Sequence, residues 1–565
     1  MNPAIADELR AHDEALRARG LDVWIGAEPT FTDARSRDRW WLTDAEGGDK
    51  LERARALAGE LAARLGRGAA VEEAPGRRFA GEKAPRFALA VHFQRGDAPA
   101  LLTVTPDPGV VEVNSAPAPD LGTFHRESLV TFAAAAACGL SPERFRYNGR
   151  VADSGGGGQL TLGGPTPLAS PFFRHPTLLP RLVRYCANHP ALSYAFAGEC
   201  VGSASQGPRP DEGVRERFEE LHVALDRLEA RGPRVEPREL WETLAPLLVD
   251  ASGNSHRAEL NVEKLWNPWL PGRGELGVVE LRSLRMPRTA DRLAAVAALF
   301  RAVAARLVAA PYVEPLPEWG ATLHDLVALP ALLDQDLRAV LADLDAHGLG
   351  PGPGVRALLH DPPEPLAQLA LGDAILAITP AAEFWPLLGD VASQERASAR
   401  LVDASSERVE LCVTAPRGGD PGRLGAAGFE VPLLALEDGY RHLAAVRFRA
   451  FTPRPGLHPA LSPTDPLVVT WARDGGVREV ALHAWIPGGG VYDGLPASAE
   501  EARRRRRERV RISPAPPRLL RPAPGTRGVT LDLRRLEALG PGAALVPGPS
   551  PREPGPGMGL PGDSP

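Results

Sequence analysis

Gly109-Val-Val-Glu-Val-Asn-Ser115 has the residue pattern of a β-strand that carries one acid among valines. Because successive side chains of a strand point to opposite faces, Glu112 shares a face with Val110 and Asn114, and the other face is apolar. One carboxylate therefore projects from a strand that is otherwise suited to a protein interior.

Two further segments repeat this arrangement. In Gly277-Val-Val-Glu-Leu-Arg-Ser283, the same alternation places Glu280 and Arg282 on one face. In Trp24-Ile-Gly-Ala-Glu-Pro-Thr-Phe31, Glu28 stands at the end of a strand that the following proline terminates or leaves at a sheet edge. Three strands thus each present a glutamate where a purely structural sheet would favour valine or isoleucine.

A run of four glycines lies between the Glu112 and Glu280 strands. Such a run costs backbone entropy, so it is best explained where a ligand approaches the main chain closely, as phosphates do in a nest of amide N–H groups. It matches neither a Walker A loop nor the Gly-x-Gly-x-x-Gly spacing. We predict a nucleotide or substrate loop made of Ser154, Gly155, Gly156, Gly157, Gly158 and Gln159.

The three glutamates suggest a site for a hard cation. Mg²⁺ and Mn²⁺ take oxygen ligands, and Mg²⁺ is usually held by one or two carboxylates with phosphate and water. Each glutamate alone could equally be a solvent-facing residue of a half-exposed strand, since glutamate is rarely buried. The occurrence of three beside the glycine run favours a metal site at Glu28, Glu112 and Glu280.

Asn254-Ser-His-Arg-Ala-Glu259 combines a serine, a histidine and an acid, but neighbouring residues cannot easily form a catalytic triad, which is recognised by geometry. If residues 257–262 form a strand, Arg257 and Glu259 share a face. That pair would suit a phosphate ligand beside a metal ligand. An ordinary cross-strand ion pair is the alternative.

Motifs of one family pattern extend from about Leu21 through Pro487-Gly-Gly489 to Leu531-Asp-Leu-Arg534, and six groups of them lie between residues 26 and 282. They are Gly26-Ala-Glu-Pro-Thr-Phe31, Asp107-Pro-Gly-Val-Val-Glu-Val-Asn114, Leu162-Gly-Gly-Pro-Thr-Pro167 with Ser170-Pro-Phe172, His189-Pro-Ala-Leu-Ser-Tyr194, Asp250-Ala-Ser-Gly-Asn-Ser-His-Arg-Ala-Glu259 and Val279-Glu-Leu-Arg282. The set resembles the bacterial putative amidoligase family, usually found as the C-terminal half of transglutaminase–amidoligase fusion proteins. That family is grouped with the glutamine synthetase-like carboxylate–amine ligases.

The resemblance implies a ligase fold in which glutamates of an antiparallel sheet bind Mg-ATP. Carried over to this sequence, it implies metal-binding carboxylates at Glu28, Glu112 and Glu280, and phosphate- or substrate-binding arginines at Arg257 and Arg282. The candidate catalytic residues are Arg282, Arg257, Glu259 and His256.

Two departures from the family pattern stand out. The family's glycine loop ends in Asn-His, whereas Gly158 and Gln159 occupy those positions here. Only about twenty residues precede the first motif, so a transglutaminase-like partner would be a separate chain.

Composition bounds the class of protein. The formal net charge of −6 over 565 residues argues against a general nucleic-acid binder, which needs a basic face. Lysine appears only as Lys50, Lys83 and Lys264, and arginine supplies the other cationic side chains. Four cysteines without CxxC spacing fit a reducing compartment, and neither a signal peptide nor a membrane span is evident. We expect a cytoplasmic protein without a membrane partner.

The expected fold class is α+β: a glutamine synthetase-like antiparallel sheet with flanking helices, and a smaller C-terminal β domain. The expected parts are an N-terminal helix (1–20), a catalytic domain (21–325), a helical extension with a Gly/Pro linker (326–365), a small β domain (366–512) and a disordered Pro/Gly-rich tail (513–565). The expected function is ATP-dependent amide bond formation between a small-molecule or peptide carboxylate and an amine, through an acyl phosphate. The alternative is a non-catalytic nucleotide- or peptide-binding relative that acts as a partner or scaffold.

Overall fold

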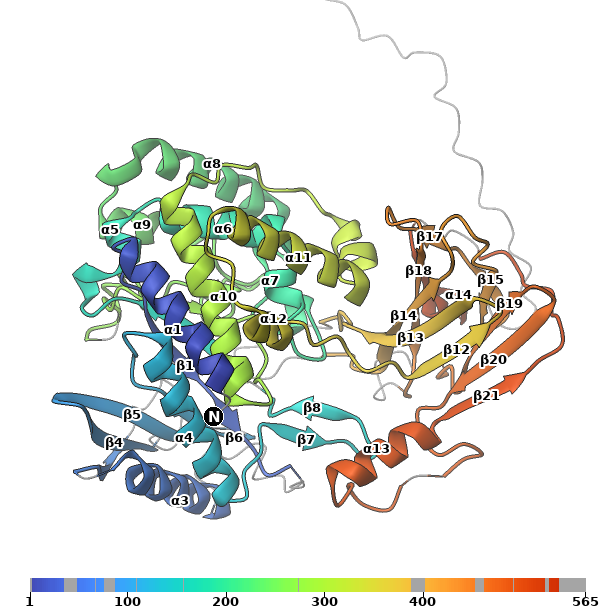
Figure 1. Cartoon of the computed structure of the whole chain (residues 1–565), viewed down its shortest axis with the longest axis horizontal. Coiled ribbons are helices and arrows are strands. Elements are labelled where there is room, and N and C mark those ends of the chain that lie inside the picture. The colour runs from blue at the N-terminus through green and yellow to red at the C-terminus, as the bar shows by residue number, and fades with distance from the viewer. Residues whose placement is uncertain are drawn as a thin grey trace, which may run out of the picture.

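The computed structural model describes residues 3–34, 48–66, 68–75, 87–107, 109–155, 157–272, 274–387, 402–452, 462–490, 492–523 and 528–537. Helices and antiparallel sheets occur side by side along the chain, so the fold is α+β as expected (Figure 1). The two largest parts are an N-terminal region that mixes helices with sheets and a C-terminal region that is mostly sheet.

A four-stranded antiparallel sheet carries two of the three glutamates. Its order is β1 (Trp24–Glu28), β9 (Gln159–Gly163), β11 (Val279–Leu281) and β10 (Leu260–Asn261). The register pairs Glu28 with Gln159 and Glu280 with Thr161. This sheet therefore brings the end of the glycine run next to the first glutamate.

A second antiparallel sheet carries the third glutamate. Its order is β2 (Thr30–Phe31), β6 (Val110–Asn114), β5 (Ala98–Asp107), β4 (Phe87–Arg95) and β3 (Ala70–Pro75). The amide of Ser115 donates to the carbonyl of Ala27 at 2.9 Å, which ties the end of β6 to β1. Glu112 pairs with Thr30, only two residues beyond Glu28. The two sheets thus meet where the acidic side chains lie.

Helices cover these sheets and supply most of the core. The longer ones are α1 (Pro3–Ala18), α3 (Gly48–Leu65), α4 (Leu121–Ala137), α6 (Leu178–Asn188), α8 (Arg215–Arg231), α9 (Pro237–Leu244), α10 (Ala290–Ala309), α11 (Pro330–Ala346) and α12 (Pro353–Leu359). Short turns of helix occur at α5 (Pro171–Arg174), α7 (Ala191–Tyr194), η1 (Pro167–Ala169), η2 (Gly202–Ala204), η3 (Pro210–Glu212), η4 (Gly232–Arg234) and η5 (Leu323–Val327).

Helix α10 is buried along nearly its whole length because it is rich in alanine, which lets neighbouring helices approach closely. Its three buried arginines are each paired with an acid, and Arg292 contacts Asp361 at 2.6 Å. Arg301 contacts Asp13 at 2.5 Å, and Arg306 contacts Asp343 at 2.7 Å. In the described part of the chain, no helix is both long and apolar enough to cross a bilayer.

The C-terminal region contains two sheets around a core of its own. One has the order β12 (Ala367–Leu371), β13 (Ala374–Ala381), β14 (Ser406–Thr414), β18 (Arg441–Arg449) and β17 (Leu434–Ala435). The other has the order β16 (Phe429–Val431), β15 (Arg423–Ala426), β19 (Leu467–Arg473), β20 (Gly476–Leu482) and β21 (Val510–Pro514). Trp471 is fully buried between them in one apolar cluster.

The expectation of a disordered tail from residue 513 is wrong for its first part. Strand β22 (Thr530–Asp532) pairs in parallel with β18, and helix α14 (Leu533–Glu537) follows it. The apolar residues Leu531 and Leu533 enter the C-terminal core, which outweighs the prolines nearby. The remainder of the expected tail, residues 538–565, lies outside the described residues.

The expected strand over 257–262 is also wrong in extent, because β10 includes only Leu260 and Asn261. The Asp250 carboxylate accepts hydrogen bonds from the amides of Ser252 and Asn254 at 2.8 and 3.0 Å. These bonds fold the preceding residues into a loop, as aspartates commonly do in turns.

The hairpin of β7 (Glu143–Phe145) and β8 (Val151–Asp153) is held by helix α13 (Ala499–Glu508), far away in sequence (Figure 1). Arg505 donates to the carbonyl of Tyr147 at 2.8 Å, and Arg506 donates to that of Gly149 at 2.8 Å. A Cβ atom on Gly149 would overlap the helix backbone. The arginine run of α13 therefore has a structural task at the hairpin that leads into the glycine run.

Candidate functional site

A buried ion cluster lies where β1 and β11 carry their glutamates. The ammonium group of Lys264 is 3.5 Å from a Glu28 carboxylate oxygen and 3.6 Å from one of Glu280. Glu280 is only 2% exposed, and its carboxylate also accepts a hydrogen bond from Arg282. Two cations therefore offset two carboxylates, with Glu280 and Arg282 buried and the Lys264 side chain 38% exposed.

Glu112 lies within the electrostatic field of the same cluster. Burial raises its pKa to about 8, and the Glu28, Asp107 and Glu280 carboxylates add to the rise. Burial also raises the pKa of Glu28, as does the charge of Glu280. The Asn114 amide donates to Glu112 at 2.8 Å and partly opposes the shift. The structure thus brings the three sequence-predicted glutamates into one electrostatically coupled region.

Glu112 should make the folded protein less stable as the pH rises from about 4.5 to about 8. Its pKa is higher in the folded protein, so the unfolded chain loses the proton first and the free energy of unfolding falls across that window. One pKa unit is worth about 1.4 kcal/mol, so the free energy of unfolding should fall by on the order of a few kcal/mol across this window. Glu112→Gln should abolish that fall, because glutamine does not titrate. Thermal unfolding of parent and variant in EDTA between pH 5 and 8 measures this; parallel pH profiles would contradict it.

The donor set fits a divalent cation in kind but is not gathered into one coordination shell. Within the described ranges, no group of three His, Cys, Asp or Glu side chains is close enough to hold a metal ion together. Burial and, to a lesser extent, mutual repulsion raise the pKa values of Glu28 and Glu112, and a divalent cation would offset the charge of such carboxylates.

Arg282 has the most distinctive environment of the predicted residues. One guanidinium nitrogen, Nη1, contacts both Glu280 and the Gln159 side-chain oxygen, the latter at 3.3 Å. Its Nε is buried and has no hydrogen-bond partner. Gln159 in turn donates to Gln206 at 3.3 Å. One donor of the guanidinium is therefore left for a ligand in the ion cluster.

The described glycines of the run pack so closely against other parts of the protein that a side chain would not fit. Gly155, Gly157 and Gly158 all have positive φ, and a Cβ on each would overlap, in that order, the Arg144 side chain, the Thr30 side chain and the Arg285 carbonyl. Two amides of the run are already used, since Gly155 donates to Asp153 at 3.0 Å and Gly158 to the Glu28 carbonyl at 3.0 Å. Ser154 is buried and bonds to Thr30 at 2.6 Å. Gly156 lies outside the described residues.

These contacts favour close packing over an open phosphate nest for the described glycines. We expect Gly158→Ala to lower the free energy of unfolding by about 2 kcal/mol or more, because it combines positive φ with a backbone clash. Gly155→Ala meets only the flexible end of Arg144 and should cost less. Chemical denaturation of both variants tests the order, which equal stabilities would contradict.

The other candidate catalytic residues do not join the cluster. His256 is largely exposed, with its ring 3.3 Å from Glu263, and Arg257 donates to the Ser205 carbonyl at 3.2 Å. Glu259 turns into the interior, where it accepts a hydrogen bond from Ser193 and lies 3.7 Å from Arg209. Burial raises the pKa of Glu259 to about 7. Only its backbone carbonyl, which accepts from the Arg282 amide at 2.9 Å, touches the site.

Sequence reasoning missed the role of Lys264. The sequence feature that could have pointed to Lys264 is the rarity of lysine, because the chain has only three lysines among 65 Lys and Arg residues. A compact ammonium can stand between two carboxylates where a guanidinium is too wide. Lys50 is also engaged within the protein, since it is fully buried and donates to the Asp107 backbone carbonyl at 2.6 Å. Lys83 lies outside the described residues.

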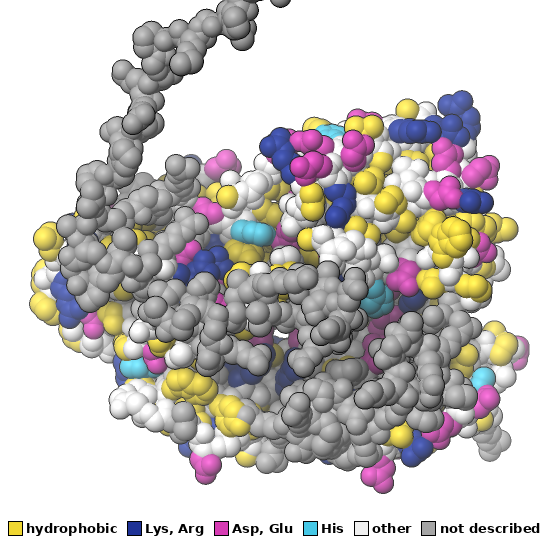
Figure 2. All heavy atoms as spheres, turned by 180° about the vertical axis from the view of Figure 1, so that it is seen from behind, with side chains coloured by type: hydrophobic (Ala, Val, Ile, Leu, Met, Phe, Trp, Pro, Cys, Tyr) yellow, Lys and Arg dark blue, Asp and Glu magenta, His cyan; other side chains and the backbone are white. Residues whose placement is uncertain are grey.

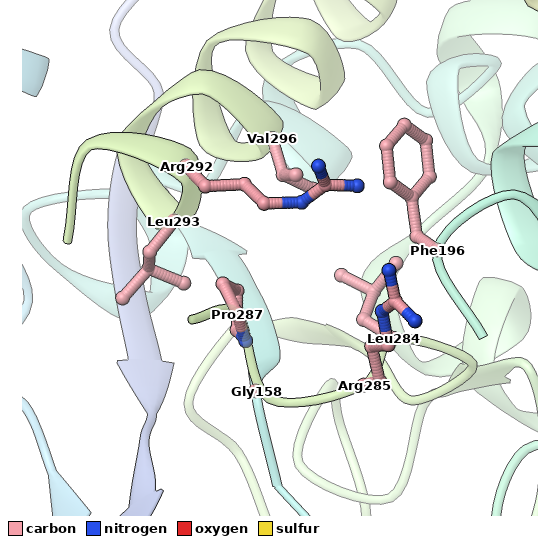
Figure 3. A pocket seen from close by; sticks show the side chains of 8 residues that line it. All are labelled: Gly158, Phe196, Leu284, Arg285, Pro287, Arg292, Leu293 and Val296. Atoms are coloured by element: carbon pink, nitrogen blue, oxygen red, sulfur yellow. The ribbon is translucent and has the colours of Figure 1, made fainter. Parts of the chain in front are cut away.

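A small pocket lies behind the glycine run (Figure 3). Gly158, Phe196, Leu284, Arg285, Pro287, Arg292, Leu293 and Val296 line it. The guanidinium of Arg292 extends toward Phe196, and one of its nitrogens, Nη2, is buried without a partner. Burial lowers the pKa of Arg292 to about 10, and the nearby Arg285 adds to the effect. The loop therefore has the cluster on one side and a cationic pocket near Arg285 on the other.

Comparison with known protein families supports a ligase. A family model described as "Putative amidoligase enzyme (DUF2126)" matches residues 4–101 and 100–534. No curated protein sequence matches the chain. The match includes every strand that carries a cluster residue, and it extends over most of the chain. The chain therefore belongs to this amidoligase family.

Proposed function

We propose that this protein is an ATP-dependent carboxylate–amine ligase that forms an amide through an acyl phosphate. The observation that carries the proposal is the buried cluster in which Arg282 keeps a free Nε beside Glu280 and Lys264. The family assignment supplies the ligase class. ATP, the intermediate and the glutamine synthetase-like relationship are our inference from the resemblance of the motifs.

In the proposed reaction a substrate carboxylate oxygen attacks the γ-phosphorus of ATP and ADP leaves. The amine then attacks the acyl carbon, phosphate leaves, and the amine gives up a proton. Carboxylate and triphosphate repel each other, so catalysis depends mainly on positioning and on fixed positive charge. Arg282 would donate its free Nε to an oxygen of the transferring phosphoryl group, and Lys264 would offset negative charge beside it.

Glu28, Glu112 and Glu280 would hold Mg²⁺ or Mn²⁺, which supplies charge neutralisation of the phosphate oxygens when bound. Their buried carboxylates and mutual repulsion support this assignment. A tight binding site for the cation would lower the pKa of Glu112 towards its ordinary value of 4.5.

Isotope transfer tests the intermediate. A panel of small-molecule and peptide carboxylates is labelled with ¹⁸O in the carboxyl group and incubated with ATP, Mg²⁺ and amines. If an acyl phosphate forms, one labelled oxygen appears in the released phosphate. Unlabelled phosphate released in step with amide formation would exclude the acyl phosphate.

A non-catalytic binding protein is the second candidate, because Gln159 occupies the position of the family's histidine. Gln159 contacts Arg282 and Gln206, so its side chain is engaged within the protein. Thermal stabilisation by Mg-ATP without ADP release from any carboxylate and amine pair would favour this candidate.

Two further expectations belong to the proposal. We place the reaction in the cytoplasm, where ATP is available and the cysteine thiols stay reduced. We also propose that a separate transglutaminase-like protein acts with this chain, as the fusion architecture of the family implies.

A further inference from the structure

A cleft of about 470 Å³ lies between the N-terminal region and the C-terminal sheets. Strand β8, helix α11, residues 359–366, the facing ends of β13 and β14, and helix α13 border this interdomain cleft (Figure 1). Its volume is within the range of about 300 to 1,000 Å³ that ligand pockets occupy. None of the residues of the ion cluster lines it.

Positive charge in the interdomain cleft is only partly neutralised. Nearly all of its carboxylates are matched by cations of the chain: Glu199 by Arg146, Glu407 by Arg150, Asp361 by Arg285, Glu383 by Arg447, Asp334 by His360 and Glu364 by Arg506. The exception is Asp153, which accepts from the Gly155 amide. In the described part of the chain, no ion pair is formed by Arg408, Arg503, Arg507 or Arg509.

The arginines of the cleft without an ion-pair partner among the described residues lie both on helix α13 and on the sheet that forms the opposite wall of the cleft. Arg503 and Arg507 are exposed on α13, whereas Arg408 and Arg509 are buried and donate to backbone carbonyls. Burial lowers the pKa of Arg408 to about 10, although the charges of Glu383, Asp325 and Glu410 partly oppose the shift. The cleft thus favours an anionic ligand. On the face shown in Figure 2, the coloured basic and acidic side chains are interspersed.

Three buried groups on lining residues have unused hydrogen-bonding capacity. Arg408 Nε, Ser406 Oγ and Glu383 Oε2 have no partner, and their residues are 2%, 2% and 3% exposed. A guanidinium nitrogen needs an acceptor, a carboxylate oxygen needs a donor, and a hydroxyl can serve as either. Peptide groups offer a carbonyl and an N–H at close spacing. An apolar wall, which includes Leu333, Leu337 and Trp385, suits the remaining surface of such a chain.

The interdomain cleft reaches the candidate site at one end. Asp153 lines it and directly precedes Ser154 of the glycine run. Arg285 lines both the cleft and the small pocket that contains Gly158 (Figure 3). A chain seated in the cleft would therefore end against the glycine run.

We propose that the interdomain cleft binds an acidic peptide, which is the carboxylate substrate of the ligase. Arg503 and Arg507 hold its side-chain carboxylates, and Arg408, Ser406 and Glu383 bond to its backbone. The role as substrate rests on the proposed function, whereas binding of the peptide does not.

Fluorescence anisotropy with a fluorescein-labelled hexaglutamate peptide tests the binding. We expect Arg503→Gln combined with Arg507→Gln to weaken binding by about tenfold, as two charge contacts at a low-salt interface would, and added salt to weaken the parent similarly. Arg504→Gln is the matched control on the same helix, because Arg504 pairs with Glu501 and Glu508 and does not line the cleft. Its affinity should stay within about twofold of the parent.

Equal affinity of the parent and the double variant for hexaglutamate would overturn the proposal. So would hexaglutamine binding as tightly as hexaglutamate, or stronger binding of a deoxythymidine hexamer. Thermal unfolding confirms that each variant is folded. If hexaglutamate binds as expected while no carboxylate and amine pair yields ADP, the peptide site stands and the ligase proposal fails.

Discussion

Replacing Glu280 by glutamine is expected to reduce ATP-dependent turnover by at least about 100-fold, the usual effect of removing one preorganised charge. Glutamine keeps the size of the side chain but removes the charge that faces Lys264 and Arg282. The pKa of Glu28 should fall at the same time, because the Glu280 charge contributes to raising it. Steady-state phosphate release and amide yield measure the first effect.

His256→Gln is the matched control for this experiment. His256 is a neighbour of the site in sequence, yet it is exposed and its ring faces Glu263. We expect its turnover to stay within about threefold of the parent, since surface ion pairs contribute little. Retained turnover in Glu280→Gln, or an equal loss in both variants, would rule out a special role for the buried cluster.

Arg282→Lys is expected to have the second large effect. Lysine keeps a positive charge near Glu280 but loses the planar group that contacts Glu280 and Gln159 through Nη1 while Nε stays free. We expect kcat to fall by about 100-fold with a smaller change in the KM for ATP, because the lost donor acts mainly on the transferring phosphoryl group.

Two measurements separate this effect from simple misfolding. The melting temperature of Arg282→Lys should remain close to that of the parent, since the charge that faces Glu280 is kept. Addition of guanidine or methylguanidine should restore part of the activity if the missing donor is the cause. Unchanged kcat in the variant would show that the guanidinium donors of Arg282 are not needed for turnover.

The period-two alternation of valines in the sequence is enough to predict the strands that carry Glu112 and Glu280. Glu112 and Glu280 lie on β6 and β11 as the valine pattern predicted, because these short strands are buried and their pattern reflects local geometry. Their closeness depends on the pairing of β1 with β9 and β6, which joins segments distant in sequence. Alternation within one strand carries no information about that pairing.

The error in the extent of the strand at residues 257–262 has the same origin. A strand over 257–262 would place Arg257 and Glu259 on one face, but β10 includes only Leu260 and Asn261, and Glu259 lies 3.7 Å from Arg209 in the interior. The glycine run predicts a ligand loop, and in the structure its described glycines accommodate Thr30 and the backbone of Arg285. A glycine run in the sequence indicates that another group packs closely against the main chain. Only the tertiary structure identifies that group.

The docking of helix α13 on the β7–β8 hairpin has a consequence for synthesis of the protein. The hydrogen bond from Arg505 to the Tyr147 carbonyl cannot form until Arg505 has been synthesised, and Arg505 lies 358 residues further along the chain. Ribosomes add about 5 to 20 residues per second, so the nascent hairpin emerges roughly 20 to 70 s before its anchor. The region around the glycine run is thus among the last parts to reach its final conformation, and translation that stops before α13 leaves that region without its support.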